Sequence, residues 1–244
     1  MNTKHILLTS ALVVSALAFT SCEDFFDTSS KKDLNTETAY SNLESAEMAL
    51  VGCYDGWQRT ISDEGVGMYL LAEFASEQAF AGLGLSDAKN NNVIDQFNLG
   101  IAPSYNDIFN VDWQNYYKAI FRCNQLIVQE DNIDWAGDIK AQGRVMGEAH
   151  AIRGILYFDL VRMFGDVPLL TAPSEENIPR SPASDVYQLI FEDFKYAIEH
   201  IPADAYPLDN NDTNDGRITK YAAEALMARA YLYHTCLLYT SPSP

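Results

Sequence analysis

The sequence is poor in basic residues. Lysine and arginine together number 16, whereas aspartate and glutamate number 34, so the formal net charge at pH 7 is −18. Proteins bind phosphate backbones through clustered lysine and arginine, and we therefore expect no nucleic-acid partner. An anionic membrane surface would repel this chain as well, so any attachment to a membrane must use a hydrophobic anchor.

The sequence also lacks the short motifs that mark common active sites and metal sites. It has no G-x-S-x-G, no H-E-x-x-H, no phosphate-binding loop and no Cys/His spacing suited to zinc. The acidic run 209–216 is similar to a calcium loop, but Asn211 and Thr213 fall at its first and third positions. Ala222 stands where such a loop needs a bidentate glutamate. We expect no metal, no cofactor and no enzymatic activity.

The apolar run at residues 6–19 is too short for a comfortable transmembrane helix. It follows Lys4 and His5 and has the form of a secretion signal. We therefore expect residues 1–21 to be a signal peptide that is removed from the mature protein.

The end of this run resembles the lipobox of bacterial lipoproteins. Small residues precede Cys22, although Phe19 stands where leucine is usual. We expect Cys22 to become an acylated N-terminus, because several acyl chains hold a protein on a bilayer where one does not. Residues 22–36 are polar and would form the lipidated tether. The alternative is an ordinary signal peptide with a cysteine after it by chance.

Cysteine is scarce, and the remaining three cysteines show no pairing pattern. Cys53 and Cys123 each fall within a helical apolar pattern, and Cys236 lies near the C-terminus. Internal cysteines of this kind more often behave as small buried hydrophobes than as a disulfide. A Cys53–Cys123 bridge stays open as the alternative in an exported protein.

Hydrophobic periodicity predicts an all-α fold. Apolar residues make up 48% of 244 residues, which is enough for one sizeable core. They recur at three- and four-residue steps, and no convincing alternating strand run is present. Helices in antiparallel succession predict an α-solenoid with irregular loops, spanning residues 37–234. The helices are expected at about 41–57, 68–80, 113–127, 143–164, 181–201 and 219–234.

Several residues are expected to mark helix ends through their capping chemistry. They are Ser41 with Glu44 as a capping box, Gly165 as a C-terminal cap, Ser181 as an N-cap before Pro182 in the first turn, and Thr219 as an N-cap.

Residues 235–244 abandon the helical period. They resemble the translation of a sequencing adapter at a broken assembly end, so we expect a non-native tail on a fragment of a longer protein. The alternative is a natural disordered C-terminus.

Two polar residues lie on apolar helical stripes. Asn124 shares a stripe with Ile120 and Ile127, and Arg153 falls among apolar residues of the next helix. Buried polar groups need hydrogen-bond partners, so we expect Asn124 to bond a neighbouring backbone turn and Arg153 to find buried acceptors. Both would then be structural residues.

The region 86–112 is rich in Asn and Asp and is expected to be the longest irregular segment. Long ordered loops are often functional, and Tyr and Asn side chains suit sugar ligands. We select as candidate ligand-binding residues Asn91, Asn92, Asp95, Tyr105 and Asn106. The alternative is that each is an ordinary solvated loop residue.

Four segments, in order, resemble the SusD/RagB family. They are WQNYYKAI at 113–120 with Asn124; EA at 148–149 with Arg153, YFDLV at 157–161 and FGDVPL at 164–169; RSP at 180–182 with DVY at 185–187; and GRITK at 216–220 with YLY at 231–233. The resemblance covers most of residues 17–234.

This resemblance implies a fold built on tetratricopeptide-like helix pairs and a binding protein that is not an enzyme. It implies an outer-membrane lipoprotein facing the exterior, where Glu23-Asp24 resemble a surface-sorting signal. The implied partners are a SusC-type TonB-dependent transporter and an oligosaccharide or, in some members, a peptide. The alternatives are a helical-repeat adaptor that binds only proteins and, more remotely, a surface glycosidase.

Overall fold

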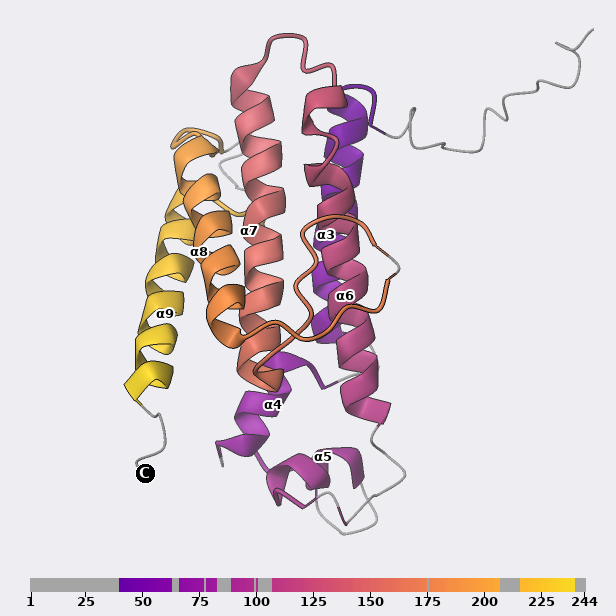
Figure 1. The fold of residues 1–244 in the computed structure, drawn as a ribbon, viewed down its shortest axis with the longest axis vertical. Helices are drawn as coiled ribbons and strands as arrows, with labels where there is room; N and C mark the ends of the chain where they lie inside the picture. The colour runs from indigo at the N-terminus through magenta and orange to yellow at the C-terminus, as the bar shows by residue number, and fades with distance from the viewer. Residues whose placement is uncertain are drawn as a thin grey trace, which may run out of the picture. The chain divides into compact units, whose positions relative to one another are not determined.

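The computed structural model describes residues 40–62, 66–76, 78–82, 89–98, 100, 107–174, 176–206 and 216–239, all within a unit that extends from Thr38 to Pro244. Within these ranges the chain forms α-helices and one short 3-10 helix, with no β-strand, which confirms the all-α prediction. The α-helices, labelled as in Figure 1, are α3 (Leu43–Ser62), α4 (Gly67–Ala75), α5 (Lys89–Asp95), α6 (Asp107–Ile127), α7 (Ile139–Phe164), α8 (Ala183–His200) and α9 (Lys220–Tyr239).

Some predictions concern residues outside the described ranges. The signal peptide, Cys22 and the tether all fall before residue 40. The acidic run 209–216 also lies outside the described ranges, except for Gly216. These expectations stay predictions.

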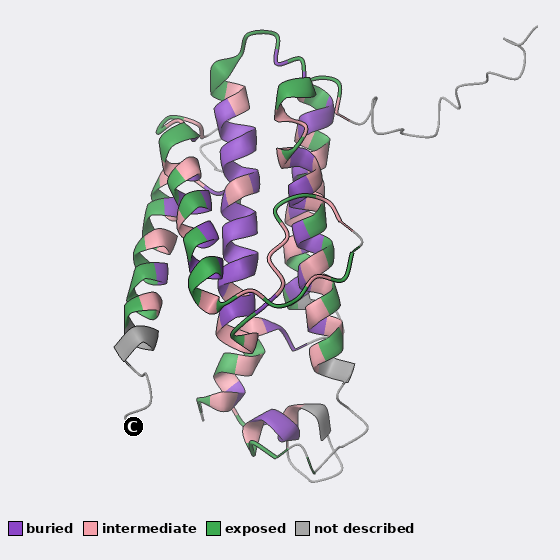
Figure 2. Ribbon diagram, viewed as in Figure 1, coloured by how far each residue is buried: buried purple, intermediate pink, exposed green. Residues whose placement is uncertain are grey.

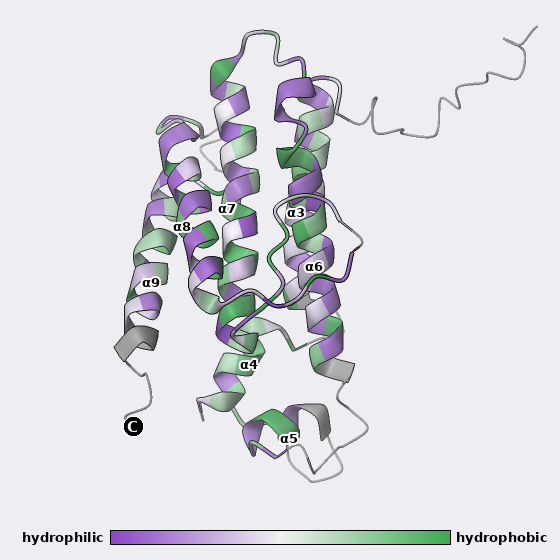
Figure 3. Cartoon of the chain, in the orientation of Figure 1, coloured by the Kyte–Doolittle hydropathy of each residue, from purple (hydrophilic) through white to green (hydrophobic). Residues whose placement is uncertain are grey.

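The most buried helix is α7. It packs against α3, α6, α8 and α9, and Figure 2 shows it buried along most of its length. The sequence predicted this coverage, because the helix has no clean polar face. Three of its buried residues are nevertheless charged, namely Arg144, Glu148 and Arg153, and the mixed hydropathy of α7 in Figure 3 reflects them.

Two glycines of α7 allow the end of α8 to approach closely. A Cβ atom on Gly147 would lie 2.5 Å from Cγ1 of Ile201, and one on Gly143 would lie 2.5 Å from the carbonyl oxygen of His200. Non-bonded atoms do not approach so closely, so only glycine permits this packing. The α7–α8 pair is thereby fixed in its register.

The glutamate of α7 joins separate segments of the chain. Glu148 accepts hydrogen bonds from the hydroxyls of Tyr54 (2.6 Å) and Tyr206, and Arg217 lies 3.8 Å from it. Tyr54 also accepts the backbone N–H of Ile218 at 2.8 Å. One fully buried carboxylate therefore attaches α3 and the segments on either side of 207–215 to α7.

α4 and α5 form a small lobe with its own cluster of Val66, Phe74, Ala81 and Ile94. Asp112 of α6 accepts the backbone N–H groups of Val66 (3.2 Å) and Gly67 (3.0 Å). These donors are otherwise unsatisfied at the start of a helix, so Asp112 supplies the cap that α4 lacks locally.

The prediction of one irregular segment over 86–112 is wrong in part. α5 occupies Lys89–Asp95, and α6 begins at Asp107 instead of near Trp113. Asn and Asp are poor helix formers, but Val93 and Ile94 of α5 are buried. Tertiary burial here outweighs local propensity. The helix expected at 68–80 also ends early, at Ala75.

Two predicted caps are corrected by the structure. The N-cap of α3 is Asn42, whose Oδ1 accepts the N–H of Ser45 while Ser45 Oγ accepts the N–H of Asn42, both at 3.0 Å. The first free N–H of α8, on Ala183, is bound at 2.8 Å by Asp166. Sequence-distant Asp166 thus does what was assigned to Ser181, and Pro182 is the residue before the helix.

Other boundaries agree with the prediction or extend it. Gly165 ends α7 with a φ of 68°, and Thr219 Oγ1 accepts the N–H of Ala222 at 3.2 Å, as expected for these caps. α7 begins earlier than expected, at Ile139, because Asp138 accepts the N–H of Ala141. α9 continues to Tyr239 instead of ending at 234. No glycine or proline interrupts that stretch.

Candidate ligand-binding site

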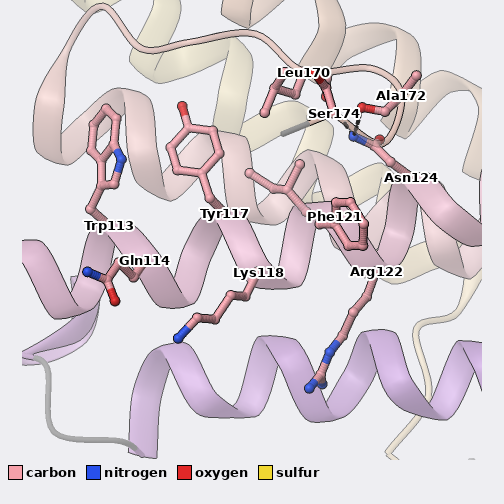
Figure 4. A pocket seen from close by; sticks show the side chains of 11 residues that line it. Trp113, Gln114, Tyr117, Lys118, Phe121, Arg122, Asn124, Leu170, Ala172 and Ser174 are labelled. Carbon is pink, nitrogen blue, oxygen red and sulfur yellow. Dashed lines mark hydrogen bonds between the residues drawn. The ribbon is translucent and has the colours of Figure 1, made fainter. Parts of the chain in front are cut away.

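A hollow of about 730 Å³ lies between α6 and residues 170–174, which belong to the segment that connects α7 to α8. We call it the α6 groove. Its side chains form two rows at four-residue steps, which share a face because four residues advance a helix by about 6 Å and roughly one turn. The rows, drawn in Figure 4, are Trp113, Tyr117 and Phe121, and below them Gln114, Lys118 and Arg122.

The aromatic row is held in place at one end. The ring centroid of Trp113 lies 5.0 Å from that of Tyr117 and 5.2 Å from that of Phe164, which it meets edge to face. The guanidinium carbon of Arg180 lies over the Trp113 ring, 5.3 Å from its centroid. The hydroxyl of Tyr117 donates to the carbonyl of Pro168 at 2.7 Å. These contacts leave Trp113 and Tyr117 half-buried and fixed, while Phe121 is 38% exposed.

The opposite wall is pinned by buried side chains. Asn124 Nδ2 donates to the carbonyls of Leu170 (2.9 Å) and Ala172 (3.4 Å). The Tyr157 hydroxyl accepts the N–H of Leu170 at 2.7 Å and donates to its carbonyl at 2.9 Å. The prediction that Asn124 bonds a neighbouring backbone segment is confirmed. Hydrogen bonds from buried side chains of α6 and α7 therefore hold the backbone of this wall in place.

Arg153 ties this wall to α8. Its Nε and Nη2 donate to the two carboxylate oxygens of Asp193 at 2.9 and 2.7 Å, and its Nη1 donates to Asn124 Oδ1 at 2.8 Å. Nη1 also reaches the carbonyl of Thr171 at 3.3 Å. A buried arginine needs such acceptors, and the structural role predicted for it is confirmed.

The lower row brings positive charge to an otherwise acidic chain. Arg122 Nη1 donates to the carbonyl of Gly52 at 3.0 Å and to Asp55 Oδ2 at 2.5 Å. Hydrogen bonds from Arg122, and next from Arg59, lower the pKa of Asp55. Lys118 lies one turn before Arg122 with an exposed side chain. The groove thus combines flat apolar faces with hydrogen-bond donors along one edge (Figure 4).

Three of the residues selected from sequence lie on a different helix from the α6 groove. Asn91, Asn92 and Asp95 share α5, where Asn92 is only 2% exposed and the other two are half-buried. Tyr105 and Asn106 lie outside the described residues. Whether these five bind a ligand stays a prediction. The sequence does contain a signal for the groove, namely aromatic residues at 113, 117 and 121, which fall at four-residue steps.

An exposed aromatic residue follows α5, in the small lobe that α4 and α5 form. Phe97 is 74% exposed and has a φ of 49°, in the left-handed region. Its N–H bonds the carbonyl of Ile94, and the N–H of Asn98 bonds that of Val93, which is the Schellman pattern with Phe97 at the position usually held by glycine. An exposed phenylalanine in this conformation is strained, and such strain often accompanies function.

The described residues contain neither a cluster suited to a metal ion nor a membrane-spanning helix. Among them, no three His, Cys, Asp or Glu side chains are grouped to hold a metal ion. In the same part of the chain, no helix combines the length and hydrophobicity required to cross a bilayer.

Comparison with known proteins gives a consistent result. Residues 24–232 match the model of a SusD-like family described as starch-binding and associating with the outer membrane. A SusD-like protein P38 from Formosa agariphila is 24% identical over 235 residues, covering 94% of this chain and 42% of the relative. A SusD-like protein from Bacteroides ovatus is 24% identical and is matched over 40% of its length. The chain therefore spans about two fifths of these relatives.

Solved structures agree. A laminarin-binding SusD-like protein superposes with a TM-score of 0.63 at 28% identity, over 80% of this chain and 41% of that one. A SusD homologue from Bacteroides thetaiotaomicron superposes with a TM-score of 0.62 at 26% identity, over 82% and 38%.

Proposed function

Because the chain belongs to the SusD-like family of carbohydrate-binding proteins, we propose that it binds oligosaccharides at the cell surface and delivers them to a SusC-type TonB-dependent transporter. We further propose that the α6 groove contacts the glycan. The family is one of binding proteins, generally without catalytic activity, and its description associates it with the outer membrane.

The observation that supports this proposal most is the aromatic row of the groove. Sugar rings present an apolar C–H face, which packs on aromatic rings, and hydroxyls at their edges. Trp113, Tyr117 and Phe121 follow one another at single-turn steps along α6, and the first two rings have centroids 5.0 Å apart. Such a row can contact consecutive sugar units. Gln114, Lys118 and Arg122 can donate hydrogen bonds to hydroxyls at the edge.

Pre-organisation favours this site as well. Binding costs less when the protein side is already ordered. Tyr117 is bonded to Pro168, and the wall at Leu170 is bonded to Asn124 and Tyr157. A ligand would therefore meet two walls that are already held by hydrogen bonds.

The surface location rests on the sequence and the family together. Cys22, with its lipobox-like approach, would be acylated, and Glu23-Asp24 would direct the lipoprotein outward. Mass spectrometry of the membrane-extracted protein should show a lipidated N-terminal Cys22 peptide. An unmodified Cys22, or a peptide that spans Ser21 and Cys22, would contradict the anchor.

Calorimetry tests the glycan proposal directly. Malto- and laminari-oligosaccharides are the first probes, because starch appears in the family description and laminarin in the name of a similar structure. Phe121→Ala should weaken binding by about fivefold, since an aromatic contact contributes on the order of 1 kcal/mol. Val128→Ala is the matched control, because Val128 is 43% exposed just after α6 but does not line the groove.

The outcomes separate the candidate functions. Equal affinities for the Phe121→Ala and Val128→Ala proteins would exclude the groove as the glycan site. Co-purification with a TonB-dependent barrel, but no glycan binding across a wider panel, would favour a protein-binding adaptor or a peptide binder.

A further inference from the structure

Cys53 and Cys123 are free thiols whose side chains are completely buried. Cys53 lies on α3 and Cys123 on α6, and both belong to the main core cluster. Both are buried, as their place in helical apolar patterns predicted. Their positions on the two helices, however, place them opposite each other.

Contacts on either side of the pair show this register. A Cβ on Gly56 would lie 3.0 Å from Cβ and 3.1 Å from Cα of Ala119, so the two backbones touch there. About one turn away, Arg122 reaches the carbonyl of Gly52. The helices are therefore antiparallel. Cys53 falls between Gly52 and Gly56, and Cys123 follows Arg122.

The thiols interact across this interface. Burial raises the pKa of the Cys123 thiol, and a hydrogen bond with the Cys53 side chain raises it further. A disulfide requires Cα atoms closer than about 7 Å. The close approach of the backbones at Gly56 and Ala119 brings Cys53 and Cys123, one turn along, to facing positions.

We propose that Cys53 and Cys123 form an intramolecular disulfide that joins α3 to α6. The oxidant is a thiol–disulfide oxidoreductase in its disulfide form. The thiolate of one cysteine attacks the oxidant's disulfide, forms a mixed disulfide and releases one oxidant thiol. The second cysteine then attacks the first, which closes the Cys53–Cys123 bond and releases the other oxidant thiol. Two thiol protons are lost, and the oxidant ends as a dithiol.

Closure is expected during folding. Thiols are reactive as thiolates, and a buried thiol with a raised pKa is inert. The pair should react while α3 and α6 are still packing. The inference depends on the proposed function only for its oxidising compartment outside the cytoplasm.

Peptide mapping tests the bond without ambiguity, because trypsin places each of the four cysteines on a different peptide. The peptides 33–59 and 123–140 should be joined in unreduced protein from the membrane fraction, and the joined species should be lighter by two hydrogen atoms than the separate peptides. Purified protein refolded in a glutathione redox buffer should give the same species.

The two experiments, on protein from the membrane fraction and on refolded protein, distinguish this inference from the proposed location. Separate, fully alkylated peptides after refolding in glutathione buffer would overturn the inference. A joined pair in buffer with reduced cysteines in cells would overturn it for the living cell and would count against export. Glycan binding by the purified chain is unaffected by either result and is judged by calorimetry.

Stability provides a second readout. A bond that closes such a long loop should raise the thermal midpoint by about 5–15 °C, and dithiothreitol should reverse the rise. The double variant Cys53→Ala/Cys123→Ala is the control, and its midpoint should not respond to dithiothreitol. An equal response of both proteins would contradict the proposed bond.

Discussion

Asn124 of α6 and Arg153 of α7 form a buried hydrogen bond, with Nη1 of the arginine 2.8 Å from Oδ1 of the amide. The same amide donates to the carbonyls of Leu170 and Ala172. The same guanidinium donates to the carboxylate of Asp193 on α8. This pair of side chains therefore joins three helices, α6, α7 and α8, to the wall of the α6 groove. Neither residue needs to touch a ligand to shape the site.

Replacing this amide should loosen the wall. Asn124→Leu keeps the volume of the side chain but removes the Oδ1 acceptor from Nη1 of Arg153 and the Nδ2 donor from the Ala172 carbonyl. We expect a loss of about 1–3 kcal/mol in the free energy of unfolding, measured in urea. Gln125→Leu on the same turn is the control and should change stability little. Equal effects of the two substitutions would contradict the role given to Asn124.

The buried carboxylate on α7 predicts a pH dependence. Burial raises the pKa of Glu148 above its usual value despite hydrogen bonds from Tyr206 and Tyr54 and the nearby charges of Arg217 and Arg144. The folded protein therefore binds this proton before the unfolded chain does. As pH falls from the raised pKa towards about 4.5, Glu148 adds to stability, and this contribution is lost as pH rises.

Glu148→Gln isolates this contribution, because glutamine does not titrate. When the pH is lowered from about 7 to about 5, protonation of Glu148 should add to the free energy of unfolding of the native chain. The Glu148→Gln protein should lack this added stability. Glu224→Gln, at an exposed position of α9, should behave like the native chain. Identical slopes for all three proteins would show that the Glu148 pKa is not raised.

The helix pattern was readable from the sequence where the cause is local. Apolar periodicity located α7, Gly165 ended it, and the polar residues Asn124 and Arg153 on apolar stripes implied buried partners, which the structure supplies. What could not be read depends on distant residues. Asp166 caps α8, and Asp112 caps α4, from elsewhere in the chain.

The groove was missed for the same reason. From sequence alone, an aromatic stripe on α6 is indistinguishable from a buried core face. The structure shows that segment 170–174 passes beside this stripe and leaves a hollow between them. That passage is fixed by Asn124 and Tyr157. Periodicity shows that a face is apolar, but it does not show whether another helix or an open hollow lies against it.

Two glycines one turn apart on α3 should respond oppositely to alanine. A Cβ on Gly56 would lie 3.0 Å from Cβ and 3.1 Å from Cα of Ala119, which is tighter than ordinary contact, whereas a Cβ on Gly52 would meet nothing within 4 Å. Gly56→Ala should lose about 1–3 kcal/mol by overpacking, and Gly52→Ala should gain about 0.5–1 kcal/mol from helix propensity. Urea unfolding of both proteins checks the sign. A stabilised Gly56→Ala protein would show that α3 and α6 do not touch there.

The strained phenylalanine of the α5 lobe provides the last prediction. Phe97 holds a left-handed φ of 49° at a Schellman position, where a side chain costs about 1 kcal/mol or more. Phe97→Gly should therefore stabilise the end of α5, seen as slower hydrogen exchange at Asn98. Phe80 is equally exposed without a positive φ, so Phe80→Gly should give no such gain. If Phe97 is retained for ligand contact, Phe97→Gly should also bind glycan more weakly, and a stabilised protein with unchanged affinity would exclude that role.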